Sequence, residues 1–307
     1  MLPPSGDQFE ICGGGYRAVI TESGGALRLL ERDGVALVDG FDEDEMPFGG
    51  RGQQLVPWPN RLRDGKYTFE GRDLQLPLTE PARHNASHGL VRWTAWTLEE
   101  HTERSVALTY RLMAQTGYPW TLDLRVVYDV SADGLTVTQS ATNLSDERAP
   151  YASGCHPYLS VGRGPVDGWE LTLPAATHLL VDERKLPVGR EPVDGTPYDF
   201  RMARPIRDLQ LDDGFTDLVG DEDGVTTVVV SDPGAGRSLA LWVDSQHRWL
   251  QAYTADDAPT TARRSIAVEP MTSPPDAFRS GDDLIVLSPS GEPGDEFSAT
   301  WGLRALD

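Results

Sequence analysis

Four short segments carry side chains that suit proton transfer and the binding of hydroxyl groups; they are residues 57–62, 85–90, 154–158 and 268–278. His156 precedes Pro157, which holds the His156 backbone extended, and an unperturbed pKa of ~6.5 suits a histidine to general acid catalysis. Glu269 ends an apolar run and precedes Pro270. A charged residue is seldom left in such a place without a partner or a purpose. Glu269 is therefore either a general base or half of a buried ion pair with an arginine.

The two earlier segments offer hydrogen-bond donors for a small polar ligand. Asn60 and Arg61 follow Trp58, which two prolines bracket. The prolines reduce the entropy lost on binding, the guanidinium supplies fixed donors, and the indole offers a flat face to a sugar ring. His88 precedes Gly89, whose bare backbone allows a close approach. Both could instead be structural, with Arg61 in a salt bridge and His88 hydrogen-bonded within the fold.

The elements that must position these residues are strands, because the dominant hydrophobic period is two. Residues 120–130 alternate apolar and polar side chains, and an Asp-Gly turn follows before a second alternating run. Similar turns lie at Asp33-Gly34, Gly71 and Pro233-Gly234. With no convincing helix longer than about three turns, this predicts an all-β antiparallel sandwich or barrel. No linker or repeat interrupts residues 1–307, so we expect a single domain, with 182–210 as an ordered excursion.

Composition and net charge limit the classes of binding partner and the cellular location that we expect. The net charge is −21 and no run of basic residues offsets it, which excludes nucleic acid and anionic membrane surfaces as expected partners. The first fifteen residues lack the features of a signal peptide, and no run of 18 apolar residues exists, so we expect a cytoplasmic protein. Two cysteines, Cys12 and Cys155, form neither a disulfide framework nor a zinc site, in keeping with a reducing cytosol.

Three further chemistries are not expected. Cys155 and His156 are adjacent in an extended segment, so their side chains point apart and do not form a dyad. His84 and His88 have the i,i+4 spacing of a helical metal pair, but their segment has the character of a loop. The chain has no nucleotide-binding loop of the usual patterns. We therefore expect no metal and no other cofactor.

Taken in order, the motifs resemble those of the aldose 1-epimerase (galactose mutarotase) family, from about residue 14 to about residue 302. The residues that carry the resemblance are Asn60-Arg61, His88-Gly89, His156-Pro157-Tyr158, Asp212 and Glu269, the last followed by a Pro-containing turn. The resemblance implies a large antiparallel β-supersandwich with an open sugar cleft. It implies that Glu269 is the general base at the C1 hydroxyl and that His156 is the general acid at the ring oxygen. Arg61, His88 and Asp212 would hold the sugar, with Asn60 and Tyr158 beside them.

Two departures from the family pattern bear on the substrate. Many members have Asp-His where this chain has Asp212-Asp213, so Asp217 is a rival for the binding carboxylate. His88-Gly89 is followed by Leu90-Val91-Arg92 and not by the second glycine common in galactose-active members. The pattern is closer to the broader, less characterised branch of the family than to its galactose-specific members. It does not identify the sugar or show whether the sugar is phosphorylated.

The expected reaction is interconversion of the α and β anomers of a free hexose. It needs one base and one acid, and a neighbouring carboxylate such as Asp212 is expected to raise the pKa of His156. Two alternatives stay open. One is a non-catalytic sugar-binding protein on the same fold. The other is a glycoside hydrolase that uses Asp212 and Glu269 as a carboxylate pair. Oligomeric state and pathway are not predicted.

Overall fold

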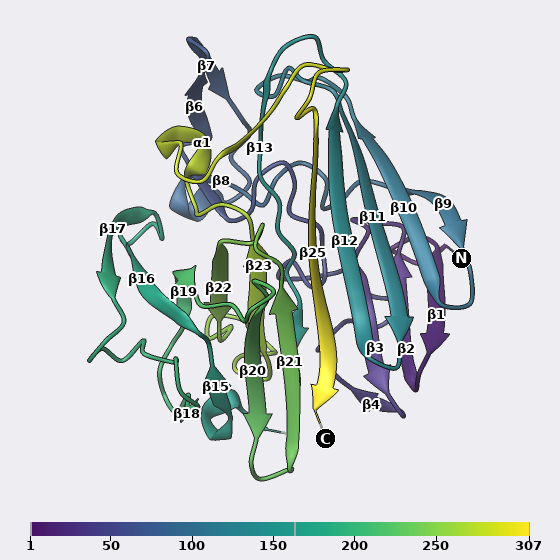
Figure 1. Cartoon of the computed structure of the whole chain (residues 1–307), viewed down its shortest axis with the longest axis vertical. Coiled ribbons are helices and arrows are strands. Elements are labelled where there is room, and N and C mark those ends of the chain that lie inside the picture. The colour runs from purple at the N-terminus through teal and green to yellow at the C-terminus, as the bar shows by residue number, and fades with distance from the viewer. Residues whose placement is uncertain (1, 163, 307) are drawn as a thin grey trace.

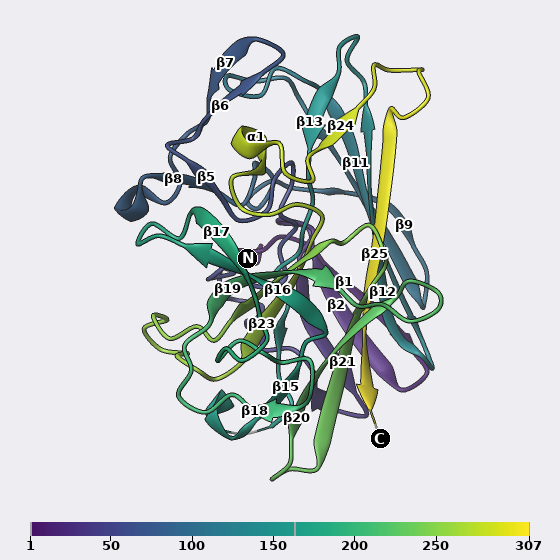
Figure 2. The same cartoon turned by 60° about the vertical axis from the view of Figure 1, so that its left-hand side comes forward.

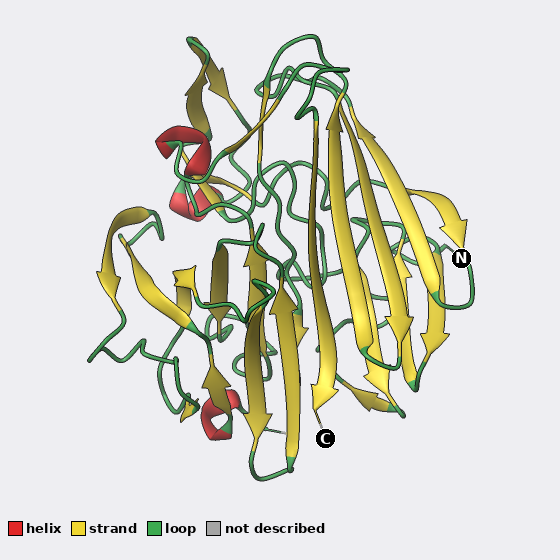
Figure 3. Cartoon of the chain, viewed as in Figure 1, coloured by secondary structure: helices red, strands yellow, loops and turns green. Residues whose placement is uncertain are grey.

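Almost all regular structure in the molecule is antiparallel β-sheet (Figure 3). The computed structural model describes residues 2–162 and 164–306. Helix is confined in this part of the chain to one short α-helix, α1 (Ala277–Ser280), and two 3₁₀ turns, η1 (Pro81–Arg83) and η2 (Val166–Gly168). The all-β prediction is confirmed. No helix in the described ranges has the length and apolar character needed to span a bilayer.

The largest sheet has nine strands and forms the long wall of the molecule in Figure 1. Its strands, in spatial order, are β18 (Arg204–Pro205), β15 (Glu170–Thr172), β20 (Thr226–Asp232), β21 (Arg237–Val243), β25 (Glu296–Leu306), β12 (Gly134–Asn143), β11 (Leu122–Ser131), β10 (Ser105–Leu112) and β9 (Thr97–His101). The predicted hairpins β11–β12 and β20–β21 are both present. β25 pairs with β12 on one side and β21 on the other, so it joins two groups of strands.

A four-stranded meander packs against one end of this wall. It consists of β1 (Gln8–Gly13), β2 (Tyr16–Thr21), β3 (Leu27–Arg32) and β4 (Val35–Ala36). β1 and β2 contact β11, and Figure 1 shows them behind it. The inward side chains of the two sheets, among them Ile11, Ile20, Val126 and Tyr128, belong to one continuous apolar core. This is the sandwich that alternating patterns produce when two half-apolar sheets bury their faces together.

A six-stranded sheet lies beside the sandwich and carries most of the candidate site. Its order is β14 (Tyr158–Leu159), β23 (Ile266–Met271), β22 (Trp249–Tyr253), β19 (Asp212–Leu218), β16 (Ala175–Val181) and β17 (Pro187–Pro192). Gln251 pairs with Glu269, and Asp212 pairs with Tyr253. Side chains that are opposite one another in a pair, or two apart along a strand, point to the same face. The register therefore places Glu269, Gln251, Tyr253 and Asp212 on one face.

Three two-stranded pairs complete the fold: β5 (Arg61–Arg63) with β8 (Asn85–Ser87), β6 (Lys66–Phe69) with β7 (Arg72–Gln75), and β13 (Ala149–Tyr151) with β24 (Ile285–Leu287). Figure 2 shows β5 and β8 above the end of the six-stranded sheet that carries β17. Arg184, in the turn between β16 and β17, donates to the carbonyl oxygens of Arg83 and His84. These bonds fasten the β5–β8 pair to that sheet.

Candidate active site

A cavity of about 260 Å³ lies where the face of the six-stranded sheet meets the β5–β8 pair. This is slightly below the ~300–1,000 Å³ typical of small-ligand pockets. All seven residues predicted as the site line it: Asn60, Arg61, His88, His156, Tyr158, Asp212 and Glu269. They come from positions up to 209 residues apart in the chain, and strand pairing brings them together.

Glu269 and His156, which both line the cavity, are in direct contact. His156 Nε2 lies 3.3 Å from Glu269 Oε1, and both side chains are almost fully buried, at 5% and 3% exposed. Within the described residues, His156 Nδ1 and Glu269 Oε2 have no hydrogen-bond partner. Buried polar atoms left without a partner are uncommon in folded proteins and often mark sites of chemistry.

Burial sets the protonation of this pair. It raises the pKa of Glu269 well above its ordinary value, with a further contribution from the negative charge of Asp212, although Arg61 opposes both. Burial also lowers the pKa of His156 to about 3, helped by the positive charges of Arg92 and Arg51. The expectation of a raised pKa for His156 is therefore wrong, because burial and two arginines lower it. Both shifts favour the uncharged form of each group in the empty site.

Close packing fixes the orientation of the His156 ring. Tyr158 stacks on it with ring centroids 4.8 Å apart and planes 6° from parallel. The Tyr158 hydroxyl donates to the Gly49 carbonyl oxygen at 2.8 Å. A Cβ at Gly50, where φ is +78°, would lie 2.9 Å from His156 Cδ2, so only glycine fits there without a shift. Gly49 and Gly50 have no signal in the sequence beyond a turn, and they were not predicted.

Arg61 is held by two carboxylates that also line the cavity. Its Nε lies 3.0 Å from Glu80 Oε2, and its Nη2 lies 3.5 Å from Asp212 Oδ2. Asp212 also accepts a hydrogen bond from Gln251 Nε2 at 2.8 Å, and Lys185 Nζ lies 3.7 Å from it. One hydrogen bond and two ion pairs therefore hold the Asp212 carboxylate, which suits binding and orientation better than proton donation. Glu80 was not predicted, because its partner is nineteen residues away in the chain.

Asp212 and its rival Asp217 are separated by the geometry of β19. Five residues apart on a strand, their side chains point to opposite faces. Asp217 is exposed, accepts a hydrogen bond from Thr177, and lies outside the cavity. Asp213 also points away from the cavity. It accepts a hydrogen bond from His178 Nε2 at 3.0 Å on the other face, and its Oδ2 accepts from the backbone N–H of Asp212.

His88 presents one defined tautomer. The backbone N–H of Asn60 donates to His88 Nδ1 at 3.1 Å, so the neutral ring carries its proton on Nε2. Burial lowers the pKa of His88 well below its ordinary value, as do the charges of Arg92, His156 and Arg61. Asn60 and His88 both have positive φ, and Gly89 packs against the Val56 carbonyl oxygen, where a Cβ would lie 2.0 Å away. The tight backbone therefore fixes the position of the His88 ring and of its Nε2–H donor.

Trp58 and Cys155 both lie in buried surroundings. Trp58 does not offer its face to the cavity, because it is buried against Phe278 with ring centroids 5.7 Å apart. Its aromatic surface is used in the core, so the expectation of a sugar platform there is wrong. Cys155 is fully buried, and burial raises the pKa of its thiol. A buried thiol with a raised pKa is a poor nucleophile.

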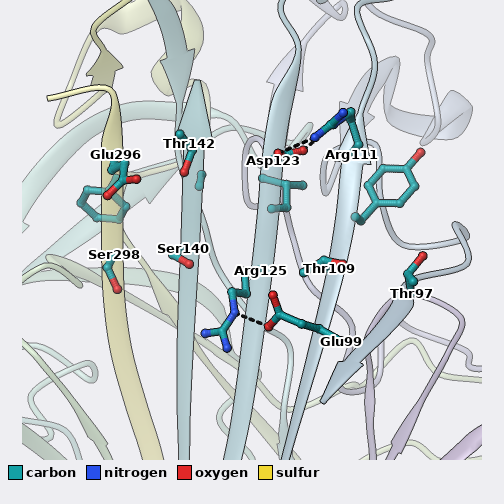
Figure 4. Close-up of a pocket in the computed structure, with 14 residues that line it drawn as sticks. Thr97, Glu99, Thr109, Arg111, Asp123, Arg125, Ser140, Thr142, Glu296 and Ser298 are labelled. Carbon is teal, nitrogen blue, oxygen red and sulfur yellow. Dashed lines mark hydrogen bonds and ion pairs between the residues drawn. The ribbon is translucent and has the colours of Figure 1, made fainter. Parts of the chain in front are cut away.

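A larger hollow, of about 840 Å³, lies on the outer face of the nine-stranded sheet (Figure 4). Four of its five charged side chains pair with one another. Arg111 Nε lies 2.6 Å from Asp123 Oδ1, and Arg125 Nε lies 2.6 Å from Glu99 Oε2. The other labelled residues in Figure 4 are mainly serine and threonine along the strands. With its arginines compensated and no histidine in its lining, this face offers far less chemistry than the smaller cavity.

Comparisons with known proteins agree on one family. The aldose 1-epimerase family model matches residues 7–300. The uncharacterized protein YihR of Escherichia coli (strain K12) is 35% identical over 301 residues, which cover 98% of this chain and 94% of YihR. Human galactose mutarotase is 27% identical over 257 residues, covering 75% of this chain and 71% of that protein.

Solved structures agree on the fold. The GalM/aldose epimerase homologue from C. elegans superposes with a TM-score of 0.84 at 18% identity, covering 98% of this chain and 99% of that one. Galactose 1-epimerase from Lactobacillus acidophilus NCFM superposes with a TM-score of 0.79 at 21% identity, covering 96% and 92%. At these identities the likeness establishes the architecture, which is the predicted supersandwich.

Proposed function

The chain belongs to the aldose 1-epimerase family, and we propose that it interconverts the α and β anomers of a free aldose by opening and closing the sugar ring. The observation that carries the proposal is the contact between Glu269 and His156 inside a cavity lined by polar donors. The reaction needs one group that accepts a proton from the C1 hydroxyl and one that gives a proton to the ring oxygen.

In this proposal the pair holds a single proton throughout the reaction. As the bond between C1 and the ring oxygen breaks, Glu269 takes the proton of the C1 hydroxyl and His156 gives its proton to the ring oxygen. The product is the open-chain aldehyde, in which rotation about the C1–C2 bond presents the other carbonyl face. Closure reverses both transfers and yields the other anomer.

The 3.3 Å contact between His156 Nε2 and Glu269 Oε1 would allow the proton to move between the two groups. The raised pKa of Glu269 and the lowered pKa of His156 favour a protonated Glu269 in the empty site. That distribution is the one needed for ring closure, and ring opening needs the proton on His156. Direct transfer between Oε1 and Nε2 interconverts the two without exchange with solvent. Arg61, His88 and Asp212 would bind the sugar hydroxyls, with Asn60 and Tyr158 supporting them.

The hydrolase alternative has less support. A hydrolase would use Asp212 and Glu269 as a working carboxylate pair. Arg61, Lys185 and Gln251 already engage Asp212, whereas the group in contact with Glu269 is a histidine. Sugar binding without catalysis remains the other outcome of the experiment that follows.

Anomer exchange of freshly dissolved α-glucose and α-galactose, followed by polarimetry and exchange NMR, tests the proposal. We expect the wild-type protein to accelerate exchange, and we expect Glu269→Gln to lower kcat by ~10²–10⁴-fold, the usual contribution of a general base. Glu99→Gln, on the outer face of the nine-stranded sheet, is the matched control and keeps full activity. If the folded wild-type protein accelerates no aldose, with or without a charged substituent, the proposal is wrong and a binding role replaces it.

A further inference from the structure

The His156 ring belongs to a series of four flat side chains in contact with one another. Tyr158 stacks on His156, with ring centroids 4.8 Å apart. The guanidinium carbon of Arg51 lies 4.0 Å from the centroid of the Tyr158 ring and 4.1 Å from that of the Phe48 ring. A guanidinium stacks well on aromatic faces, and the attraction is strongest where water is excluded. Arg51 is therefore connected to His156 through a single aromatic ring.

The Arg51 guanidinium has little freedom to move. Its side chain is 2% exposed, and its Nη2 lies 3.0 Å from Asp39 Oδ2. Its Nε donates to the Asp39 carbonyl oxygen at 3.1 Å, and Nη2 also donates to Thr261 Oγ1 at 3.3 Å. The adjacent backbone is tied to His156, because Gly52 N–H donates to the His156 carbonyl oxygen at 2.9 Å. The cation and the His156 ring are therefore held in a fixed relative position.

Stability alone does not account for a buried cation at this place. The free energy needed to remove both charges of a buried ion pair from water is comparable to their attraction. Well-packed apolar side chains in the place of such a pair often stabilise a protein as much or more. An apolar side chain at position 51 could also pack against the rings of Phe48 and Tyr158. The presence of a charge here indicates a role in the chemistry of the site.

Arg51 differs from the other charged groups around His156. Arg61 and Arg92, whose charges also act on His156, line the cavity, so a ligand can contact them. Within the described structure Arg51 lies outside the cavity lining, so it can affect a bound sugar only through a neighbouring side chain. The remaining titratable groups that face His156 are Glu269, His88, Tyr158 and Tyr253.

We propose that Arg51 is a positioning residue for ring opening, which through Tyr158 fixes the plane of the His156 ring and places a permanent positive charge near the proton donor; this rests on the proposed function. The orientation matters because a proton donor must be aligned with the ring oxygen that receives the proton. Tyr158 is then more than a support for the sugar, since it connects the buried cation to the His156 ring.

The charge of Arg51 suits the acid that ring opening needs. The ring oxygen of an aldose is a weak base, so it accepts a proton readily only from a strong proton donor. A positive charge close to an imidazolium disfavours the protonated ring and so promotes release of its proton. The pKa of His156 agrees with this role, since burial lowers it most and the charges of Arg92 and Arg51 lower it further, to about 3.

The first test follows the protonation of His156 without any ligand. NMR of the imidazole nitrogens between pH 7 and pH 3.5 reports it, and His156→Gln assigns the signals. In the wild-type protein we expect the ring to stay neutral until the pH approaches about 3. In Arg51→Met the midpoint should rise by roughly one pH unit, because one positive charge close to the ring is lost.

Kinetics of anomer exchange test the consequence for the reaction. Arg51→Met is expected to lower kcat by ~10–10²-fold, because a proton donor that is less acidic and less well aligned transfers its proton more slowly. KM should change by less than about 3-fold, since Arg51 lies outside the cavity lining. Arg51→Lys keeps the charge and loses the flat stack, so it should keep the wild-type midpoint of His156 and recover only part of kcat.

Arg264→Met is the matched control. Arg264 shares Asp39 with Arg51, since its Nη2 lies 2.7 Å from Asp39 Oδ1, but its side chain is 52% exposed. We expect neither kcat nor the His156 midpoint to change. In Arg51→Met the Asp39 carboxylate keeps Arg264 and the Ser265 hydroxyl, which donates at 2.9 Å. If Arg51→Met does not fold, Arg51→Gln, which keeps donors for Asp39 and removes the charge, takes its place.

Three outcomes would overturn the inference. The first is a His156 midpoint that stays unchanged when the charge at position 51 is removed, whatever happens to kcat. The second is a raised KM with kcat unchanged, which would show that Arg51 shapes the binding of the sugar. The third is a lower Tm with kcat, KM and the midpoint all unchanged, which would make Arg51 purely structural. If the wild-type protein accelerates no aldose, the proposed function has failed, and that result depends on no Arg51 variant.

Discussion

At the scale of single residues, the proposed reaction depends on one contact, between His156 Nε2 and Glu269 Oε1. Because Glu269 and His156 are coupled, they titrate as a pair, and the protonation steps belong to the pair. In the proposed reaction the pair is competent while it holds one proton. A second proton binds only as the pH approaches the lowered pKa of His156, about 3. The last proton leaves only as the pH passes the raised pKa of Glu269.

This predicts an unusual pH profile. We expect kcat/KM for anomer exchange to stay constant from about pH 6.5 to about pH 4.5, although an ordinary histidine pKa, ~6.5, lies at one end of that range. Asp212 contributes to the raised pKa of Glu269, so Asp212→Asn should move the alkaline limb of the profile to lower pH. Exchange NMR across the pH range checks both. An acid limb with its midpoint above pH 5, or an alkaline limb that Asp212→Asn leaves in place, contradicts this account.

Residue-scale chemistry was partly visible in the sequence. His156 and Glu269 could be selected because their neighbours, Pro157 and Pro270, set them apart from ordinary strand residues. The direction of the His156 pKa could not be predicted, because it depends on burial and on Arg51 and Arg92. Those arginines are distant from His156 in sequence, and only the folded chain places them beside it.

At the scale of elements, the back of the six-stranded sheet holds Asp212 in place. His178 on β16 lies between two carboxylates, with Nδ1 3.0 Å from Glu191 and Nε2 3.0 Å from Asp213. Its side chain is only 3% exposed, and Tyr198 stacks on it. Burial alone would lower the pKa of His178, but its hydrogen bonds to Asp213 and Glu191 outweigh burial and raise it. Asp213 in turn accepts from the backbone of Asp212.

The cluster of His178, Asp213 and Glu191 should stabilise the folded protein to an extent that depends on pH. A histidine with a raised pKa in the folded state contributes stability that is complete below its unfolded pKa, ~6.5, and is lost as the pH rises through the folded value. We expect His178→Gln to lower the free energy of unfolding by ~3 kcal/mol at pH 6, because it leaves buried Asp213 without its charged partner.

Calorimetric melting of both proteins at pH 6 and pH 8.5 tests this. A chain of this size should lose roughly 6 °C in Tm at pH 6, and the difference should narrow at pH 8.5. His84→Gln is the control, since that side chain is 70% exposed, and its Tm should match the wild type. A His178→Gln deficit that grows toward pH 8.5 would show that the imidazolium is not the stabilising form.

The elements themselves were predictable where the signals are local. Asp133-Gly134 joins β11 and β12, and Gly71 lies in the turn between β6 and β7, as the turn residues indicated. The choice between Asp212 and Asp217 required the register of β19 against β22, which no local pattern specifies. Trp58 was misjudged for the same reason, because its partner Phe278 is more than two hundred residues away.

At the scale of the whole molecule, β25 is the strand on which the nine-stranded sheet depends. It follows every other described strand in the chain, yet it occupies an interior position between β12 and β21. Its inward side chains Trp301 and Leu303 are fully buried. Removing the strand would expose two long hydrogen-bonding edges and leave a gap in the core.

We expect a chain that ends at residue 295 to lack a cooperative thermal transition and to aggregate on expression. A chain that ends at residue 304 keeps Trp301, Leu303 and the pairing of β25 with β12, so it should melt cooperatively with a lower Tm. Circular dichroism melts and size-exclusion chromatography distinguish the two. A cooperative, monodisperse product from the shorter chain would show that β12 and β21 do not need the strand between them.

The position of β25 also has a consequence for biosynthesis. Nascent chains begin to fold from their N-terminal parts while synthesis continues. Here the edges of β12 and β21 that pair with β25 stay unpaired until β25 is synthesised, after all the other described strands. Unpaired strand edges are templates for association between chains. During translation on crowded polysomes, neighbouring nascent chains would therefore compete with β25 for the same edges, and the yield of folded protein would depend on how fast translation finishes and on chaperones that cover those edges.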